Sequence, residues 1–436
     1  MIAAALMTAA VLASAAGAPA PTGGETGLTK AEAAAGWKLY SGANATSMWR
    51  SYKGQGFPTK GWKADKGEMS LGKGGGGGDI ITEAQFADFE MQWNFKLGEK
   101  ANSGVMFRVA ETNGATYETG PEYQLLEDIS FGAKPTDPHS CAALYDLYSP
   151  AEGKVLKPAG QWNEGRIYLH SGLLQHWLNG KKVVETRLYD ASGKPTEEWS
   201  KKIAGSKFKD WKGFGVLPKG HIAIQDHGDT DLALKDVKIR DLSTPDAKAV
   251  AIFNGKDLSG LKPFLPQGKA EDVWQIKDGV LICKGNPVGY LRTEKDYTNF
   301  VLTLEWRFDP SKGAGNSGVL LRAVGEDKVW PKSVEAQLQS GAAGDFWNIG
   351  EYAMKADASR TKGRNTKRDP AAGEVERPLG EWNRYEIICD GGTIVLKVNG
   401  VEVNRATDVA VTPGKICFQS EGAEIHFRNI NLVPLD

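Results

Sequence analysis

The sequence lacks the features that mark zinc-binding, nucleic-acid-binding and membrane-spanning proteins. Its cysteines form no Cys-x-x-Cys pair and no metal-finger spacing, so we interpret them as small buried residues, with one disulfide as the alternative; they are Cys141, Cys283, Cys389 and Cys417. Lysine plus arginine total 53 against 54 acidic residues, and no long basic run occurs. This balance argues against binding to a nucleic-acid backbone. After residue 20, no apolar run approaches the ~20 residues of a membrane span.

Long leucine heptads are also missing, whereas glycine and tryptophan are abundant, with 53 and 13 residues. This composition favours many short strands joined by turns over long helices. The chain has 436 residues, of which 41% are hydrophobic, and therefore predicts two folded domains rather than a disordered protein.

Residues 1–20 form an apolar, alanine-rich stretch with two small-residue sites of the kind cleaved in export, Ala13-Ser14-Ala15 and Ala16-Gly17-Ala18. We interpret this stretch as a secretory signal peptide, although it lacks a basic start; the alternative is a disordered alanine-rich tail. The mature protein is therefore expected to be periplasmic or secreted.

An internal duplication organises the chain, because short motifs recur in the same order in both halves. The strand-like residues 89–95 match residues 300–306, and each stretch is followed by Asn-Ser-Gly-Val and then by an arginine, Arg108 or Arg322. The further pairs are Glu122-Tyr123-Gln124-Leu125 with Glu335-Ala336-Gln337-Leu338, Gly160-Gln161-Trp162-Asn163 with Gly380-Glu381-Trp382-Asn383, Asn179-Gly180 with Asn399-Gly400, and Ile224-Gln225 with Phe418-Gln419. The sequence therefore predicts two copies of one domain, at residues 30–243 and 247–436, with a polar linker between them.

The fold class follows from the periodicity within each copy. Hydrophobic and polar residues alternate along residues 89–95, and Asn-Gly hairpin turns separate neighbouring strands. We predict an all-β protein of two antiparallel β-sandwiches. Residues 188–219, present only in the first copy, are interpreted as a polar loop excursion near one rim. The glycine run at residues 74–78 lacks the Lys-Ser/Thr ending of a phosphate-binding loop and predicts a flexible turn.

Polar residues two apart fall on one face of a strand, and three such sets occur in the first copy. They are Glu122 and Gln124, with Asp128 if the strand continues; His221, Gln225 and His227; and Arg108 with Gly104 and Met106. Together they predict a concave groove for a ligand on an outer sheet face, the alternative being an ordinary polar face with ion pairs.

These motifs, together with Ala143-Leu144-Tyr145 and Gln225-Asp226-His227-Gly228, resemble the 3-keto-disaccharide hydrolase family over nearly the whole mature chain. The resemblance implies a concanavalin-like jelly roll in each copy. It also implies cleavage of glycosides already oxidised to a ketone at C3. That ketone acidifies the C2 hydrogen, so a base can form an enolate, the C1 oxygen can leave, and water can add back.

On this resemblance, the first copy is the catalyst. His227 is the leading base and Glu122 its competitor, while Asp128, or Glu127, is the acid for the leaving group. Arg108, Gln124, Gln225 and Tyr145 would bind the sugar and the developing oxyanion. A divalent metal held by Glu122, Asp128 and His227 is the alternative to Arg108 for polarising the ketone. No cofactor is certain, and the expected partner is an oxidised sugar or glycan.

The second copy keeps part of this set and is expected to bind glycan or to complete the groove of the first copy. Its candidate residues are Arg322, Glu335, Gln337, Gln419 and Trp347, and Glu421 stands where the first copy has His227. Two rival functions are a pair of non-catalytic, lectin-like or laminin-G-like modules, and a retaining glycosidase. The glycosidase fits less well, because Glu122 and Glu127 are an odd number of residues apart and face opposite ways.

Overall fold

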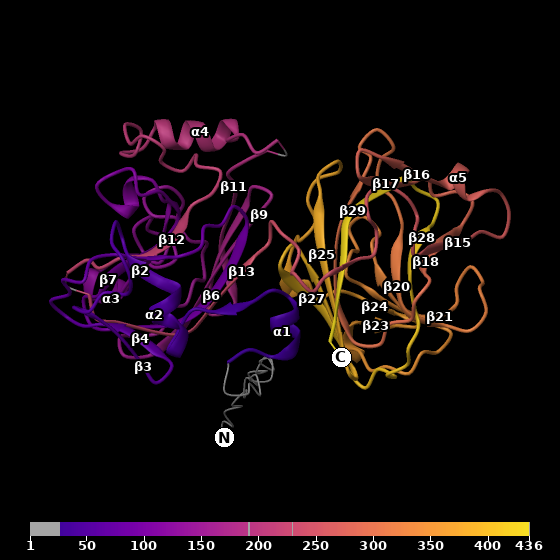
Figure 1. Cartoon of the computed structure of the whole chain (residues 1–436), viewed down its shortest axis with the longest axis horizontal. Coiled ribbons are helices and arrows are strands. Elements are labelled where there is room, and N and C mark those ends of the chain that lie inside the picture. The colour runs from indigo at the N-terminus through magenta and orange to yellow at the C-terminus, as the bar shows by residue number, and fades with distance from the viewer. Residues whose placement is uncertain (1–26, 191, 229, 436) are drawn as a thin grey trace, which may run out of the picture.

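Each copy folds into two antiparallel sheets that pack face to face. The computed structural model describes residues 27–190, 192–228 and 230–435, so the predicted signal peptide lies outside the described residues. Figure 1 shows the two copies side by side, the first in indigo to magenta and the second in orange to yellow. The predicted fold class, two tandem concanavalin-like jelly-roll sandwiches, is confirmed. No helix in the described part of the chain is long and apolar enough to cross a membrane.

We call the larger sheet of the first copy and its counterpart in the second the interface sheets, because they face each other. The first runs β11 (Lys181–Arg187), β10 (Leu173–Leu178), β9 (Trp162–His170), β6 (Phe89–Leu97), β13 (Leu232–Asp241), β4 (Glu68–Leu71) and β3 (Trp62–Asp65), with β1 (Lys38–Leu39) beside β13. The second runs β16 (Trp274–Lys277), β17 (Val280–Cys283), β29 (Ile425–Pro434), β19 (Phe300–Phe308), β25 (Asn383–Asp390), β26 (Thr393–Val398) and β27 (Val401–Ala406), with β14 (Val250–Ala251) beside β29.

The other sheet of each copy carries the candidate site residues, and we call it the site sheet. In the first copy it runs β2 (Trp49–Ser51), β5 (Ile80–Thr82), β12 (His221–Ile224), β7 (Asn102–Val109) and β8 (Glu122–Leu126). In the second it runs β15 (Leu261–Phe264), β18 (Gly289–Thr293), β28 (Lys415–Ser420), β20 (Gly318–Val324), β21 (Lys332–Gln337), β22 (Phe346–Ile349), β24 (Asn365–Thr366) and β23 (Thr361–Lys362).

Helices are short and lie at the edges of the sandwiches. They are α1 (Lys30–Ala34), α2 (Ala45–Met48), α3 (Asp128–Phe131), α4 (Glu197–Ala204) and α5 (Ala270–Val273), with 3-10 turns at Gly42–Asn44, Thr116–Glu118, Ala358–Arg360 and Pro370–Ala372. Helix α4 lies within the insert, residues 188–219, and Trp199 of this helix is fully buried in the core of the first copy. The interpretation of the insert as a loop excursion is therefore wrong, because the insert contains a helix whose Trp199 packs into the core of the sandwich.

The alternation along β6 buries Phe89, Met91, Trp93 and Phe95 in the core of the first copy, as the pattern predicts. On the opposite face of this strand, where the alternation places polar residues, Glu90 is only 2% exposed. Because the second copy covers it, Glu90 lies in a buried ion-pair network between the copies.

Arg240 joins the two copies within that network. Its Nη2 lies 2.5 Å from Glu90, and its Nη1 bonds Glu386 of the second copy. Arg166 pairs with Glu90 at 2.6 Å and also donates to the Gly400 carbonyl. The interface sheets therefore face each other, and the two site sheets lie on the far sides of the molecule (Figure 1). This arrangement excludes the expectation that the second copy completes the groove of the first.

Candidate active site

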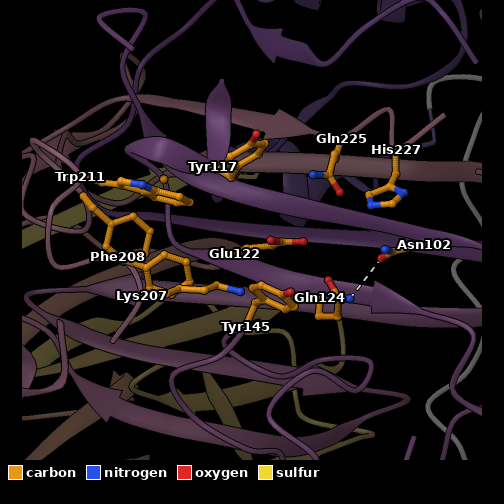
Figure 2. A pocket seen from close by; sticks show the side chains of 12 residues that line it. Asn102, Tyr117, Glu122, Gln124, Tyr145, Lys207, Phe208, Trp211, Gln225 and His227 are labelled. Atoms are coloured by element: carbon orange, nitrogen blue, oxygen red, sulfur yellow. Dashed lines mark hydrogen bonds between the residues drawn. The ribbon is translucent and has the colours of Figure 1, made fainter. Parts of the chain in front are cut away.

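A pocket of about 190 Å³ lies on the site sheet of the first copy (Figure 2). The structure brings five of the predicted site residues to it, and these are Glu122, Gln124, Tyr145, Gln225 and His227. The remaining lining residues are Asn102, Tyr117, Gly120, Lys207, Phe208, Trp211 and Phe214. Every lining residue belongs to the first copy, and the pocket combines acid, amide, imidazole and ammonium groups beside an aromatic wall.

Glu122 occupies the centre of the pocket because the neighbouring strand gives it room. In the pairing of β7 with β8, Met106 lies opposite Glu122 and Gly104 opposite Gln124. A Cβ atom at position 104 would stand 1.9 Å from Glu122 Oε1. Glycine is therefore required in the Asn-Ser-Gly motif, and Ser103 fixes the adjacent strand end by donating to the Gln225 carbonyl at 2.8 Å.

The Glu122 carboxyl favours its neutral form. Burial raises its pKa to about 8, the negative charge of Asp79 adds to this effect, and Lys207 opposes it. The Gln124 amide lies 2.8 Å from Glu122 Oε1 and 3.2 Å from Asn102. A hydrogen bond between Gln124 and Glu122 then needs a proton, which comes either from the amide NH₂ group or from a protonated carboxyl. At neutral pH, Glu122 can therefore donate a proton.

The loop that carries Gln225 and His227 is fixed by Asp226 between them. The Asp226 carboxylate accepts hydrogen bonds from the backbone N–H groups of Gly76, Gly77 and Gly78, at 2.8, 3.0 and 3.0 Å. A Cβ atom at Gly75 would stand 2.2 Å from the same carboxylate. The glycine run at residues 74–78, predicted as a flexible turn, thus wraps an anion belonging to the protein itself and holds the His227 loop in place.

The insert supplies pocket groups that the sequence patterns do not predict. Lys207 Nζ lies 4.3 Å from the centre of the Tyr145 ring, and both residues line the pocket. Phe208 and Phe214 stack at 4.3 Å, and Trp211 packs against Tyr117 at 5.6 Å. The clustering of Trp199, Phe208, Trp211 and Phe214 within an otherwise polar stretch was the available signal, because exposed loops rarely carry so many aromatic residues.

Arg108 does not reach this pocket, so its predicted role in binding sugar or oxyanion is not supported. Its backbone has a left-handed φ of 55°, which breaks the strand alternation on which the prediction rested. The guanidinium donates to the carbonyls of Ala87 and Leu217, at 2.9 and 3.1 Å, and stacks on Tyr189. Arg108 instead lines a second cavity, between the copies.

Asp128 is likewise separate from the pocket. It begins α3 rather than continuing β8, so it does not share the face of Glu122. Its carboxylate pairs with the buried Lys154 at 2.8 Å and accepts the Cys141 N–H at 2.7 Å. Glu127, its alternative, caps the same helix through the Ser130 N–H at 3.0 Å. Both acids therefore stabilise the chain turn after β8.

The family model described as a 3-keto-α-glucoside-1,2-lyase-like domain matches residues 36–241 and again residues 248–433. The chain belongs to this family. A 3-keto-disaccharide hydrolase from Bacteroides thetaiotaomicron is 30% identical over 224 residues, which cover 44% of this chain and 73% of that protein. The family and this relative mark the chain as a carbohydrate-active protein related to glycosyl hydrolases.

Solved structures also resemble single copies. A candidate glycosyl hydrolase from Parabacteroides distasonis is 30% identical, covers 49% of this chain and 98% of its own, and gives a TM-score of 0.42. The carbohydrate-binding module CBM66 from Bacillus subtilis is 12% identical, covers 40% of this chain and 95% of its own, and gives a TM-score of 0.30.

The second family domain keeps the central carboxyl. Glu335 lies opposite Leu320 and Gln337 opposite Gly318, the same register as in the first domain. Burial raises the pKa of Glu335 to about 8, and Glu421 adds to the effect. Arg322, with a left-handed φ of 50°, donates to the carbonyls of Thr298, Ala410 and Gly391, as Arg108 does to its own neighbours. It is a structural residue rather than a ligand-binding one.

The other second-domain candidates have separate environments. The Gln337 side chain accepts the backbone N–H groups of Leu338 and Gln339, at 2.8 and 2.9 Å, so it is turned toward its own strand end. Trp347 pairs with Glu335 across β21 and β22. Tyr145 holds the equivalent place in the first copy, where its backbone N–H donates to the Glu122 carbonyl. Gln419 is buried, and its Oε1 atom has no hydrogen-bond donor.

The three predicted metal ligands do not come together. Glu122 and His227 line the pocket, whereas Asp128 does not line it and forms an ion pair with Lys154. In the described ranges, Asp309, Glu424 and His426 form the one group of three such ligands whose donor atoms lie within 4.8 Å of one another. Arg307 and Lys284 also contact this group, at 3.3 and 3.0 Å, and their positive charges oppose a bound cation.

Proposed function

We propose that the first copy cleaves 3-keto-glycosides by elimination and subsequent addition of water. One observation carries the proposal: a buried carboxyl with a raised pKa, an imidazole and an amine line a single pocket, as Glu122, His227 and Lys207. An elimination next to a ketone needs a base, an acid for the leaving group and a stabiliser for the enolate oxygen. The pocket offers one group suited to each task.

In this mechanism, His227 removes the C2 proton, and the electron pair moves toward the C3 ketone to form an enolate. Lys207 and the Gln225 amide stabilise the oxygen on which negative charge develops. As the enolate collapses, the C1–O bond breaks, and the neutral Glu122 protonates the leaving oxygen. Glu122 thus takes the acid role first expected of Asp128, and Lys207 the oxyanion role first expected of Arg108.

The product of elimination is an enone with a double bond between C1 and C2. Water adds its oxygen to C1 and the protonated His227 returns its proton to C2, so the overall reaction is hydrolysis to a 3-keto sugar and a free alcohol. Glu122, now ionised, is placed to accept the proton of that water, because the same residue must work in both directions. The aromatic wall of Phe208 and Trp211 limits access of bulk water until the alcohol has left.

The test compares a methyl glucoside oxidised at C3 with the same glucoside unoxidised, with and without a chelator. We expect release of methanol from the oxidised form alone and no effect of the chelator. His227→Ala and Glu122→Gln should each lower turnover by about 10²–10⁴-fold. Glu83→Gln, at an exposed carboxylate of the same copy, and His426→Ala, remote from the pocket, serve as matched controls. Full turnover by both pocket variants would refute the assignment.

For the second copy, we propose a non-catalytic saccharide site. The buried Oε1 of Gln419 has no donor, and a Cβ atom at Gly318 would stand 2.2 Å from it and 2.4 Å from Glu335 Oε1. The Gln419 oxygen can accept from a hydroxyl group of an unoxidised sugar, the neutral Glu335 carboxyl can donate or accept, and Trp347 offers a ring for the sugar to stack against. Titration calorimetry with unoxidised glucoside tests this, because binding should weaken in Gln419→Leu and persist in Gln225→Leu. Loss in Gln225→Leu alone would place the ligand in the first copy.

We also propose that the protein is exported, with the signal peptide at residues 1–20 and a periplasmic or secreted destination. N-terminal sequencing of the mature protein should begin shortly after the Ala13-Ser14-Ala15 or Ala16-Gly17-Ala18 site. A mature protein in the cytoplasm that still begins at residue 1 would contradict the proposal.

A further inference from the structure

A second cavity, of about 380 Å³, lies between the two copies and is rich in arginine. Arg108 and Arg187 come from the first copy, and Arg377 and Arg428 come from the second. Its volume is within the range of small-molecule sites. Because both copies line it, the cavity exists only in the tandem arrangement.

Asp88, Asp190 and Glu381 also line the cavity, but direct ion pairs do not reach all four arginines. Arg187 pairs with Glu381, and Arg428 pairs with Glu305 at 2.5 Å. Arg108 has Asp88 no nearer than 3.7 Å. Among the described residues, no carboxylate forms a salt bridge with Arg377, which donates to the carbonyl of His170 at 2.7 Å and whose buried Nε has no acceptor. A partly buried guanidinium without a paired carboxylate is costly, so this site favours a bound anion.

Neighbouring arginines strengthen that preference. Burial lowers the pKa of Arg377 and the positive charge of Arg187 lowers it further, while Tyr168, Glu381 and Glu305 oppose this shift. Arg428 stacks on Trp382, with its guanidinium carbon 4.1 Å from the ring centre, and Arg108 stacks on Tyr189 at 4.2 Å. Stacking holds each planar guanidinium in one orientation, which prepares it for the paired hydrogen bonds that carboxylate, sulfate and phosphate groups accept.

We propose that this inter-copy cavity binds a small organic or inorganic anion through Arg377 and Arg428. The site is separate from the pocket of Glu122, and it stands whether or not the first copy cleaves keto-glycosides. The insert connects the two, since Tyr189 and Pro218 near its ends line the cavity while Lys207 and Trp211 line the pocket. Tyr189 also donates to the Gly215 carbonyl at 2.6 Å within the insert. An anion held there fixes the insert as well as the junction of the copies.

Titration calorimetry and thermal unfolding of the full chain test the proposal at constant ionic strength. The probes are glucuronate, sulfate and phosphate, with neutral glucose as the control ligand. We expect saturable binding of one anion per chain, and comparison of the three distinguishes a carboxylate from a sulfate or phosphate site. Binding should weaken roughly tenfold or more in Arg377→Gln and in Arg428→Gln.

Arg405→Gln is the matched control, because Arg405 belongs to an exposed pair with Glu402 and does not line the cavity. It should bind the anion as the unmodified protein does. Arg428→Gln keeps the test decisive if Arg377→Gln fails to fold, since Arg428 is about one third exposed. Absence of saturable binding, or equal binding by Arg428→Gln and Arg405→Gln, would overturn the proposal.

Discussion

Gly104 and Glu122 lie on neighbouring strands so close together that any side chain at position 104 would meet the carboxyl group. A Cβ atom there would stand 1.9 Å from Glu122 Oε1, and the second copy repeats the arrangement with Gly318 and Glu335, where the separation is 2.4 Å. Contacts under 3 Å force something to move. The glycine of the Asn-Ser-Gly motif is thus the means by which each copy buries a carboxyl on its site sheet.

Gly104→Ala should therefore displace Glu122 and disable the pocket. We expect turnover of a 3-keto-glucoside to fall at least tenfold and the free energy of unfolding to fall by about 1–3 kcal/mol. Gly205→Ala is the control, because a Cβ atom there meets nothing closer than 3.4 Å and the backbone φ is −87°. Kinetics and urea unfolding of both variants check the prediction, and unchanged turnover in Gly104→Ala would contradict it.

Asp226→Asn should loosen the loop that carries His227. The carboxylate accepts three N–H groups of the glycine run through one oxygen, and neutralising it weakens these charge-assisted bonds. We expect kcat to fall by about tenfold while KM changes little, because His227 is mispositioned rather than removed. Steady-state kinetics test this, with Asp65→Asn at an exposed position as the control. A kcat equal to that of Asp65→Asn would rule out the positioning role.

Most of the fold could be predicted from the sequence, because alternation and repeated motifs are local signals. The residues from Phe89 to Phe95 and their counterpart at 300–306 both form strands, as their patterns predict, and both strands lie at the centre of their interface sheets. The same local logic failed at Glu90. Its burial depends on Arg240 and Glu386, which lie 150 and 296 residues further along the chain.

The candidate site was predicted only where strands stay regular. Glu122, Gln124 and Gln225 follow the expected alternation and meet in one pocket. Arg108 does not, because its left-handed backbone reverses the direction in which its side chain points. No residue type in the motif predicts that conformation. Lys207 was missed for a different reason, since its position depends on an insert anchored by the burial of Trp199.

The buried ion pairs between the copies should matter greatly for stability. Glu386→Gln leaves Arg240 with Glu90 alone in a dry environment, and we expect the free energy of unfolding to fall by about 3 kcal/mol. Glu402→Gln, which breaks an exposed pair with Arg405, should cost less than about 1 kcal/mol. Urea unfolding of both variants measures the difference, and equal stabilities would show that the network contributes nothing.

The pH dependence of stability should reveal the protonated carboxyls directly. The pKa of Glu122 lies at about 8 in the folded protein against 4.5 for an ordinary glutamate. The folded state therefore holds a proton that the unfolded state releases between these values. Its contribution to stability is complete below pH 4.5 and is lost as the pH rises through about 8. Glu122→Gln cannot ionise, so it should become more stable relative to the unmodified protein as the pH rises from 6 to 9.

The expected relative gain is on the order of 1–3 kcal/mol over this range, measured by urea unfolding at several pH values. Glu335→Gln should show a gain of the same sign, because burial also raises the pKa of Glu335 to about 8. Glu83→Gln, at an exposed carboxylate, should show none. In turnover assays, activity should decline above pH 8 as Glu122 ionises and can no longer protonate the leaving oxygen. If stability and turnover stay constant from pH 6 to 9, Glu122 is already ionised at neutral pH, and it cannot then be the acid of the reaction.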